Sequence, residues 1–281
     1  MIKAENLSFS YTHVPFIRSI SFEVDRGEIF GFLGPSGAGK STLQKILTGI
    51  LPGYSGSAVV SGKEVRNHGN SFYEQIGVDF EFPSFYEKMT ARENLAFFGS
   101  LYRGPLLPIE KLLESVGLEK DGDKKVLAFS KGMKSRLNFV KAIRHNPDIL
   151  FLDEPTSGLD PVSSNRMKTL IREQRSQGKA IILTTHNMED ATELCDRVAF
   201  IVDGEMKAVD TPHRLIMSKG AARVTYSYMD GGEKSASCPL EALSEDILLA
   251  WLISNNRLLS IHSSEPTLND IFIEMTGRAL Q

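Results

Sequence analysis

One short segment constrains the fold of this chain more than any other: residues 34–41 match the pattern G-x-x-x-x-G-K-S. The apolar run Ile29–Leu33 precedes it and predicts a buried strand, and apolar residues at helical spacing follow it from Leu43 to Ile50. A glycine-rich turn between a strand and a helix surrounds a phosphate with backbone N–H groups and with the positive end of the helix. The sequence therefore predicts a phosphate-binding loop inside an α/β fold.

The residue types in this loop have separate tasks. We expect Lys40 to reach the β- and γ-phosphates of a nucleotide, and the Ser41 hydroxyl to bind Mg²⁺. A purely structural glycine-rich turn is the alternative, and it accounts less well for the flanking strand and helix. The expected nucleotide-binding residues are Gly34, Pro35, Ser36, Gly37, Ala38, Gly39, Lys40, Ser41 and Thr42.

A second segment supplies a pair of carboxylates. The apolar residues Ile149–Leu152 predict a buried strand, which ends in Asp153 and Glu154. Ligands of open α/β sheets bind at the carboxyl ends of the strands. We therefore expect Asp153 to hold Mg²⁺ through water, and Glu154 to orient and deprotonate an attacking water. An exposed acidic strand end is the alternative, and the phosphate loop upstream weakens it.

Composition and charge exclude several classes of protein. The 281 residues include 32 basic and 35 acidic side chains, so the basic surface of a duplex nucleic-acid binder is absent and no nucleic-acid partner is expected. Two distant cysteines, Cys195 and Cys238, do not suggest a disulfide framework. The longest apolar run, Ile247–Ile253, is far shorter than the ~20 residues that span a bilayer, and no secretory signal opens the chain, so we expect no direct membrane span.

The pattern along the chain predicts two parts. Residues 1–217 alternate short apolar strands with helices, and about residues 83–146 form a mostly helical subdomain. Within this part, Asp160 followed by proline predicts the start of a helix. Strand-like alternation over 222–229 and a later capping-box pattern predict a small α+β accessory unit over 218–281.

A third motif points to a family. Phe129–Met133 reads FSKGM and lies ahead of the strand that ends in Asp153 and Glu154. At this point the sequence resembles the ATP-binding-cassette (ABC) ATPases, whose LSGGQ signature lies shortly before the corresponding strand. The resemblance implies an α/β P-loop NTPase core with a mixed sheet, a helical subdomain and ATP with Mg²⁺ as ligands.

Further matches follow in the order of the family over about residues 1–215. Ser157–Asp160 looks like the D-loop, so Asp160 takes that role, and His186 stands at the switch-histidine position. Tyr11 lies where the family places an aromatic ring that stacks on adenine. The resemblance implies a Mg-dependent ATPase whose catalytic residues are Glu154, His186 and Lys40.

Two segments, the signature and the start of the lid loop, depart from the family pattern in ways that matter. The family usually has glycine in place of Lys131 and glutamine in place of Met133, whereas Ser130 and Gly132, expected to meet a γ-phosphate, are retained. Glu81 stands where the lid loop begins, a place that often holds glutamine, and phosphate oxygens repel a carboxylate there unless a cation neutralises it. A surface acid is the other reading of Glu81. The expected Mg²⁺ ligands are Ser41, Asp153 and Glu81.

The end of the chain carries a further resemblance. Ser264–Phe272 looks like the C-terminal extension of bacterial drug- and small-molecule-export ATPases, in which the ATPase is a separate polypeptide beside a membrane-spanning permease. The resemblance implies a peripheral protein at the cytoplasmic face of the cell membrane. It also implies a head-to-tail homodimer with ATP, in which the signature of one copy (Ser130, Lys131, Gly132 and Met133) closes over the nucleotide of the other.

The conformational change that ATP binding drives has to be transmitted to a partner through some surface of the domain. Seven aromatic or large apolar residues lie between Phe82 and Phe98. Two readings stay open: core packing of the helical subdomain, and an exposed groove around Phe85 and Tyr86 for a cytoplasmic helix of a permease.

Other functions compete with an exporter subunit. A soluble ABC-type switch generally has two cassettes, a long coiled-coil insertion or a basic surface, whereas this chain has one phosphate loop, no sustained heptads and a net charge of −3. A regulatory module that holds ATP without turnover does not need Asp153 and Glu154 together. A small-molecule kinase explains the phosphate loop but not the signature, the D-loop and His186.

Overall fold

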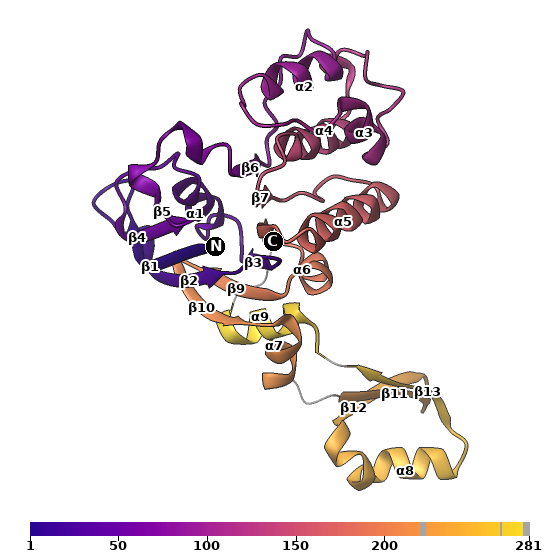
Figure 1. Ribbon diagram of the computed structural model, residues 1–281. Coiled ribbons are helices and arrows are strands. Elements are labelled where there is room, and N and C mark those ends of the chain that lie inside the picture. Colours follow the sequence, from indigo (N-terminus) through magenta and orange to yellow (C-terminus); the bar gives the residue numbers. More distant parts are fainter. Residues whose placement is uncertain (220–222, 265, 278–281) are drawn as a thin grey trace. The chain divides into compact units, whose positions relative to one another are not determined.

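The computed structural model describes residues 1–219, 223–264 and 266–277 (Figure 1). It divides into two compact units, of which the first is Met1–Val209 and the second begins at Asp210. The first unit contains all the motifs singled out above except the C-terminal one. Each unit is described by itself.

Two sheets form the framework of the first unit. Their strands are β1 (Ile2–Phe9), β2 (Ile17–Val24), β3 (Ile29–Leu33), β4 (Ser55–Val60), β5 (Lys63–Glu64), β6 (Ile76–Asp79), β7 (Ile149–Asp153), β8 (Ala180–Thr185), β9 (Arg197–Val202) and β10 (Glu205–Asp210). One sheet has the order β2-β1-β4-β5 with antiparallel pairs. The other has the order β10-β9-β3-β8-β7-β6, with parallel pairs from β9 to β6. The α/β class expected from the sequence is confirmed.

The centre of the parallel sheet is buried on both faces. Every residue of β3, β7 and β8 is buried, as expected for apolar strands covered by helices on either side. In the register, Leu33 pairs with Thr185 and Asp153 pairs with Thr184. The carboxyl ends of these three strands therefore meet at one edge of the sheet, where each continues into a candidate site segment.

Helices cover this sheet on both faces. Helix α1 (Lys40–Leu47) lies beside the antiparallel sheet, and its Leu43 and Ile46 share one hydrophobic core with Phe32 and Phe151 (Figure 1). Helix α6 (Met188–Leu194) contacts β3 and β8, and α5 (Pro161–Ser176) contacts α6. The predicted start of α5 is confirmed, because Asp160 Oδ1 accepts a hydrogen bond from the Ser163 N–H at 3.0 Å.

Three helices interrupt the sheet between β6 and β7. They are α2 (Ala91–Gly99), α3 (Ile109–Ser115) and α4 (Lys131–Ile143), all within the predicted range 83–146, and they group together in Figure 1. Helix α4 contacts β6 and β7 and thereby joins this subdomain to the sheet. The approach is close enough to require glycine: a Cβ on Gly77 would lie 2.2 Å from the Ala142 carbonyl oxygen.

The second unit is a small α+β structure. It contains α7 (Pro212–Lys219), β11 (Arg223–Met229), β12 (Glu233–Pro239), α8 (Ile247–Ser254), β13 (Leu258–Ser264) and α9 (Leu268–Thr276), with the sheet order β12-β11-β13. Residues 210–217, which the sequence places with the first part, lie in this unit, where α7 contacts α9. The capping box of Thr267 and Asp270 is present. Ala222, Glu265 and residues 278–281, parts of the predicted segments, lie outside the described residues.

The longest apolar run of the chain forms α8. Leu249 and Leu252 are buried in the core of the second unit, whereas Ile247 is exposed. Within the described ranges, no helix is both long enough and apolar enough to cross a membrane.

The buried centre of the sheet predicts a stability difference. Phe151→Ala should lower the free energy of unfolding by about 3–5 kcal/mol, because the ring is fully buried and its removal leaves a cavity. Val162→Ala is the control, since Val162 is 78% exposed and should change stability by no more than about 0.5 kcal/mol. Urea unfolding of both variants measures the difference, and equal losses would contradict this account of the core.

Candidate functional site

The phosphate loop has the backbone conformation that its glycines allow. A Cβ on Gly34 would lie 2.1 Å from the Ile201 carbonyl oxygen, so no larger residue fits there. Gly39 has a φ of 111°, a value that favours glycine, and it leads directly into α1. No side chain caps α1 and its first turn holds no acid, so its N–H groups stay available to an anion.

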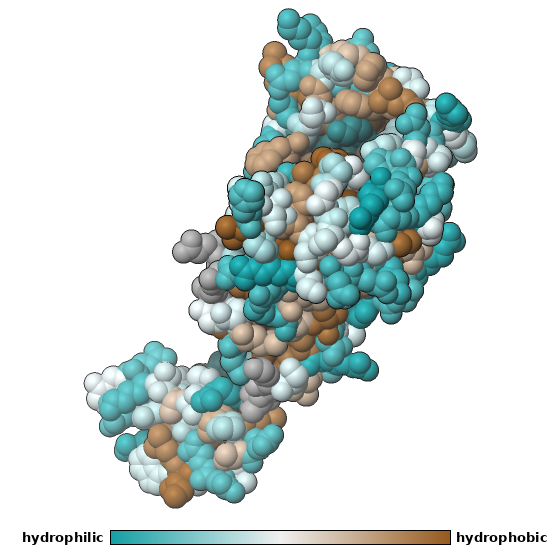
Figure 2. Space-filling model, turned by 90° about the vertical axis from the view of Figure 1, so that its left-hand side faces the viewer, coloured by the Kyte–Doolittle hydropathy of each residue, from teal (hydrophilic) through white to brown (hydrophobic). Residues whose placement is uncertain are grey.

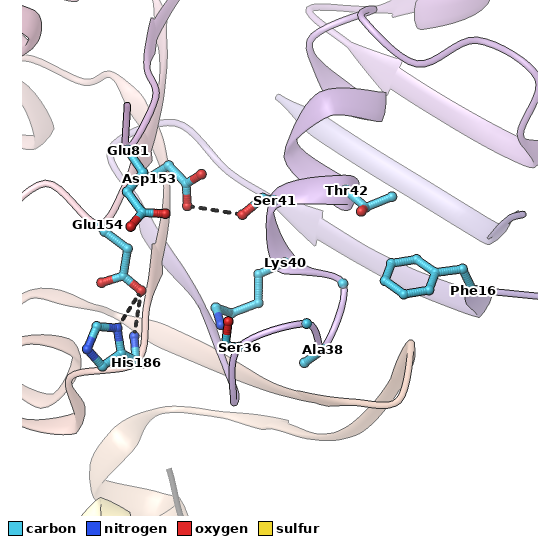
Figure 3. Close-up of a pocket in the computed structure, with 12 residues that line it drawn as sticks. Phe16, Ser36, Ala38, Lys40, Ser41, Thr42, Glu81, Asp153, Glu154 and His186 are labelled. Carbon is cyan, nitrogen blue, oxygen red and sulfur yellow. Dashed lines mark hydrogen bonds and ion pairs between the residues drawn. The ribbon is translucent and has the colours of Figure 1, made fainter. Parts of the chain in front are cut away.

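A cavity of about 320 Å³ lies over this loop (Figure 3). Residues 36–42 line it, together with Phe16, Glu81, Asp153, Glu154 and His186. The volume falls within the range of small-molecule sites. The structure thus brings together residues from the loop, the lid position, the end of β7 and the segment after β8, as the motif order predicted.

Lys40 is held inside the loop in this conformation. Its Nζ donates to the carbonyl oxygens of Gly34 at 2.6 Å and Pro35 at 3.0 Å. Burial lowers the pKa of Lys40, and the carboxylates of Glu154, Asp153 and Glu81 act in the opposite direction. An anion at the loop gives this ammonium group a stronger partner than two carbonyl oxygens.

Asp153 and Ser41 supply oxygen ligands at the same point. The Ser41 hydroxyl donates to Asp153 Oδ1 at 3.5 Å, and the Thr184 hydroxyl donates to the same oxygen. One hydroxyl and one carboxylate suit Mg²⁺, which keeps several waters and takes its other ligands from phosphate oxygens. Among the described residues, no group of three or more His, Cys, Asp or Glu side chains forms a metal site of its own. These residues fit a metal that arrives with a nucleotide.

Glu154 is fixed by the segment that follows β8. Its Oε1 accepts from the His186 N–H at 3.0 Å and lies 2.8 Å from His186 Nδ1, and its Oε2 accepts from the Thr185 hydroxyl at 3.1 Å (Figure 3). Its φ of 53° is rare for a residue with a side chain. Such strain persists only where the surroundings fix it, and it occurs most often at functional sites.

The aromatic side of the cavity differs from the expectation. The Tyr11 hydroxyl forms a hydrogen bond of 3.0 Å with the Thr42 hydroxyl, and its ring contacts Phe9 and Phe16 edge to face. Phe16, rather than Tyr11, lines the cavity. Sequence reasoning missed Phe16, although its place directly before β2, in the same loop as Tyr11, was a usable signal.

The signature lies apart from the nucleotide cavity of its own chain. The hydroxyl of Ser130 accepts from the Met133 N–H at 3.2 Å and caps α4. Neither Ser130, Gly132 nor Met133 lines the cavity over the loop. Lys131 lines a second, smaller cavity, which it shares with Glu81, Asp153 and Glu154. Asp160, at the start of α5, lines neither cavity.

A buried polar pair lies behind Glu81. Asp79 is 3% exposed, and burial raises its pKa to about 8. The Asn138 side-chain amide donates to Asp79 Oδ1 and, at 2.9 Å, to the Phe80 carbonyl oxygen. This pair joins α4 to Phe80, the residue that precedes Glu81.

Comparison with known proteins identifies the same family. The family model described as ABC transporter matches residues 17–157. The chain is 45% identical to a fluoroquinolones export ATP-binding protein of Mycobacterium tuberculosis, over 100% of this chain and 94% of that one. It is 33% identical to a linearmycin resistance ATP-binding protein of Bacillus subtilis, over the full length of both.

A solved structure of the ATP-binding subunit of an ABC transporter superimposes with a TM-score of 0.71 at 29% identity, covering 77% of this chain and 92% of that one. The resemblance inferred from the motifs is thereby confirmed. The chain belongs to the ABC transporter family, and it is an ATP-binding subunit of that family.

Proposed function

We propose that this chain binds and hydrolyses Mg·ATP and thereby powers export of a small organic compound through a separate membrane permease. One observation carries the proposal: Lys40, Ser41, Asp153, Glu154 and His186 converge on a single cavity over the phosphate loop. A module that only holds nucleotide needs no carboxylate fixed in a strained conformation beside a histidine.

The residues divide the chemistry among them. Lys40 leaves its two carbonyl partners and binds the β- and γ-phosphates, while the N–H groups of residues 36–41 surround the β-phosphate. Ser41 and Asp153 would hold Mg²⁺, with Glu81 as the third expected ligand, and the ion would neutralise charge that develops on the phosphates. Glu154 orients the attacking water and accepts its proton, and His186 keeps the Glu154 carboxylate in place.

A second copy of the chain completes the site. Ser130 and Gly132 do not line the nucleotide cavity of their own chain, so their expected contact with a γ-phosphate needs a partner related by a two-fold axis. ATP then favours the closed dimer because only that state offers it the partner's signature. Hydrolysis removes this differential affinity and the dimer opens.

Exposed aromatic residues support a docking surface for the permease. Phe82 is 78% exposed and Tyr86 is 51% exposed, and the Tyr86 ring contacts Phe97 and Phe98. Figure 2 shows apolar side chains on the surface of the helical subdomain, at the top of the view. Core packing therefore does not account for all of the aromatic residues in this segment, and a permease helix is the occupant that we propose.

The name of one relative supports export as the direction of transport, since it is a fluoroquinolones export ATP-binding protein. Another relative is named for linearmycin resistance. By analogy, we place this chain at the cytoplasmic side of the cell membrane, held there by its permease.

Glu154→Gln tests the proposed base. The variant should bind ATP but hydrolyse it at least about 100-fold more slowly, because the amide cannot accept the proton. It should also accumulate an ATP-dependent dimer, measured by light scattering after gel filtration. Glu189→Gln, an exposed acid in the first turn of α6, serves as the control. Hydrolysis at the wild-type rate in Glu154→Gln would refute the assignment.

Phe16→Ala tests the base-stacking role that the cavity supports. Its affinity for ATP should fall about tenfold, since stacking a base on an aromatic ring is worth about 1–3 kcal/mol. Its affinity for tripolyphosphate, which lacks the base, should stay unchanged. Tyr11→Phe keeps a ring but loses the hydrogen bond to Thr42, and it is the matched control. Calorimetry measures the affinity of each variant for both ligands. If Phe16→Ala lost affinity for ATP and for tripolyphosphate equally, stacking on Phe16 would be contradicted.

Phe85→Ala and Tyr86→Ala test the docking surface. In membranes that contain the permease, transport-stimulated ATP hydrolysis should fall about tenfold in each variant, as for a hot-spot residue of an interface. Basal hydrolysis by the isolated chain should remain, because neither ring lines the nucleotide cavity. Tyr73→Ala, an exposed aromatic outside the helical subdomain, is the control. Unchanged stimulation in both variants would reject this surface.

A further inference from the structure

The first turn of helix α4 carries positive side chains at the end of the helix where the dipole is also positive. Lys131 is the first residue of α4, and the first turn contains no acid to offset it. A cation at a helix N-terminus is unfavourable, because that end of the helix is already positive. The neighbouring Lys134 is compensated by an ion pair of 2.8 Å with Glu87. Among the residues that the structure describes, the Lys131 ammonium group forms no direct ion pair or hydrogen bond, so its compensation must come from elsewhere.

A small cavity supplies that compensation. It measures about 20 Å³, and among the described residues Lys131 lines it together with the acidic residues Asp79, Glu81, Asp153 and Glu154. Burial raises the pKa of Asp79 to about 8, so the negative charge beside Lys131 comes from the other three acids. The Lys131 side chain is placed there by the D-loop: a Cβ on Gly158 would lie 3.4–3.6 Å from the Cδ, Cε and Nζ atoms of Lys131. The stem of the lysine thus lies along the Gly158 backbone, beside the acids of its own chain.

Glu81 differs from Asp153 and Glu154 because no hydrogen bond within the described residues fixes its carboxylate. Asp153 and Glu154 are each fixed by hydrogen bonds from the segment around β8, whereas the Glu81 carboxylate has no direct partner among the described residues. Glu81 lines both the small cavity and the nucleotide cavity. Burial lowers the pKa of Lys40, and the negative charge of Glu81 acts against that lowering. Glu81 therefore shares one cavity with Lys40 of the phosphate loop and the other with Lys131 of the signature.

We propose that Lys131 is a positioning residue that acts on Glu81 of its own chain until Mg·nucleotide is bound. In the empty site, Lys131 attracts the Glu81 carboxylate and opposes the entry of a second cation. Once Glu81 turns to a bound Mg²⁺, Lys131 loses its attraction within the chain and becomes available to the γ-phosphate held by the partner. A chain thus offers its signature to the partner only after its own site is loaded. This inference rests on the proposed function.

The test measures Mg²⁺ binding rather than turnover. ADP is the probe, because it lacks the γ-phosphate that a partner's signature contacts. Calorimetry gives the affinity of the full-length chain for ADP without Mg²⁺ and with saturating Mg²⁺, and the change in the ratio of these affinities between variants gives the change in Mg²⁺ affinity of the ADP-bound chain. Lys131→Met, which keeps an unbranched side chain one atom shorter but removes the charge, should bind Mg²⁺ about two- to fivefold more tightly, the size expected for one exposed charge pair. Lys131→Arg should behave as the wild type does.

A second background separates a charge effect from a merely structural one. In Glu81→Gln the Lys131→Met substitution should leave the Mg²⁺ affinity unchanged, because the proposed partner is gone. Lys134→Met is the matched control, since it removes the same charge from the same helix but does not line the cavity. Raising the salt concentration should abolish the difference between Lys131→Met and wild type.

The outcomes are distinct. An unchanged Mg²⁺ affinity in Lys131→Met, or an equal gain in the Glu81→Gln background, would overturn the inference while leaving the proposed function intact. A wild-type chain that binds neither ADP nor ATP would instead overturn the proposed function. Thermal unfolding of each variant verifies folding, and Lys131→Gln, a second neutral substitution, replaces Lys131→Met if that variant does not fold.

Discussion

The site depends on the alignment of three buried parallel strands. Because β3, β7 and β8 are held in register by backbone hydrogen bonds and by burial on both faces, their carboxyl ends meet at one edge. The phosphate loop follows β3, the two acids end β7, and His186 follows β8. A shift of one residue in β7 would turn its side chains to the other face of the sheet. The chemistry therefore rests on packing that never touches the ligand.

Charge balance is the second principle of this site. Glu81, Asp153 and Glu154 line the same two cavities, and negative charges in one cavity repel one another unless cations lie close by. Lys40 provides one cation from the phosphate loop, and Lys131 provides another from the signature helix. In the proposed function, a nucleotide with its metal changes this balance, and we infer that Glu81 and Lys131 respond to that change. In this proposal, binding of Mg·nucleotide and the change at the signature both follow from the same set of charges.

The sequence predicted the features that are local in the chain. The phosphate loop, the acids at the end of β7 and the capping role of Asp160 depend on short spacings, and each has the expected place in the structure. Phe16 was missed because its contact with the cavity depends on how one loop folds over another. The nearness of Lys131 to Glu81 also escaped prediction, because it arises from the packing of α4 against the sheet. The grouping of α7 with α9 likewise depends on residues distant in sequence.

The claim at the centre of this account is that each ATP site needs two copies of the chain. Mixing two inactive variants tests it directly: Lys40→Ala lacks a working phosphate loop, and Ser130→Arg lacks a working signature. A mixed dimer contains one intact composite site, so equal amounts should recover about a quarter of wild-type ATP hydrolysis, since half of the dimers are mixed and each has one of two sites. Recovery on mixing would establish the shared site. A Ser130→Arg chain that hydrolyses ATP alone, or a mixture that stays inactive, would contradict it.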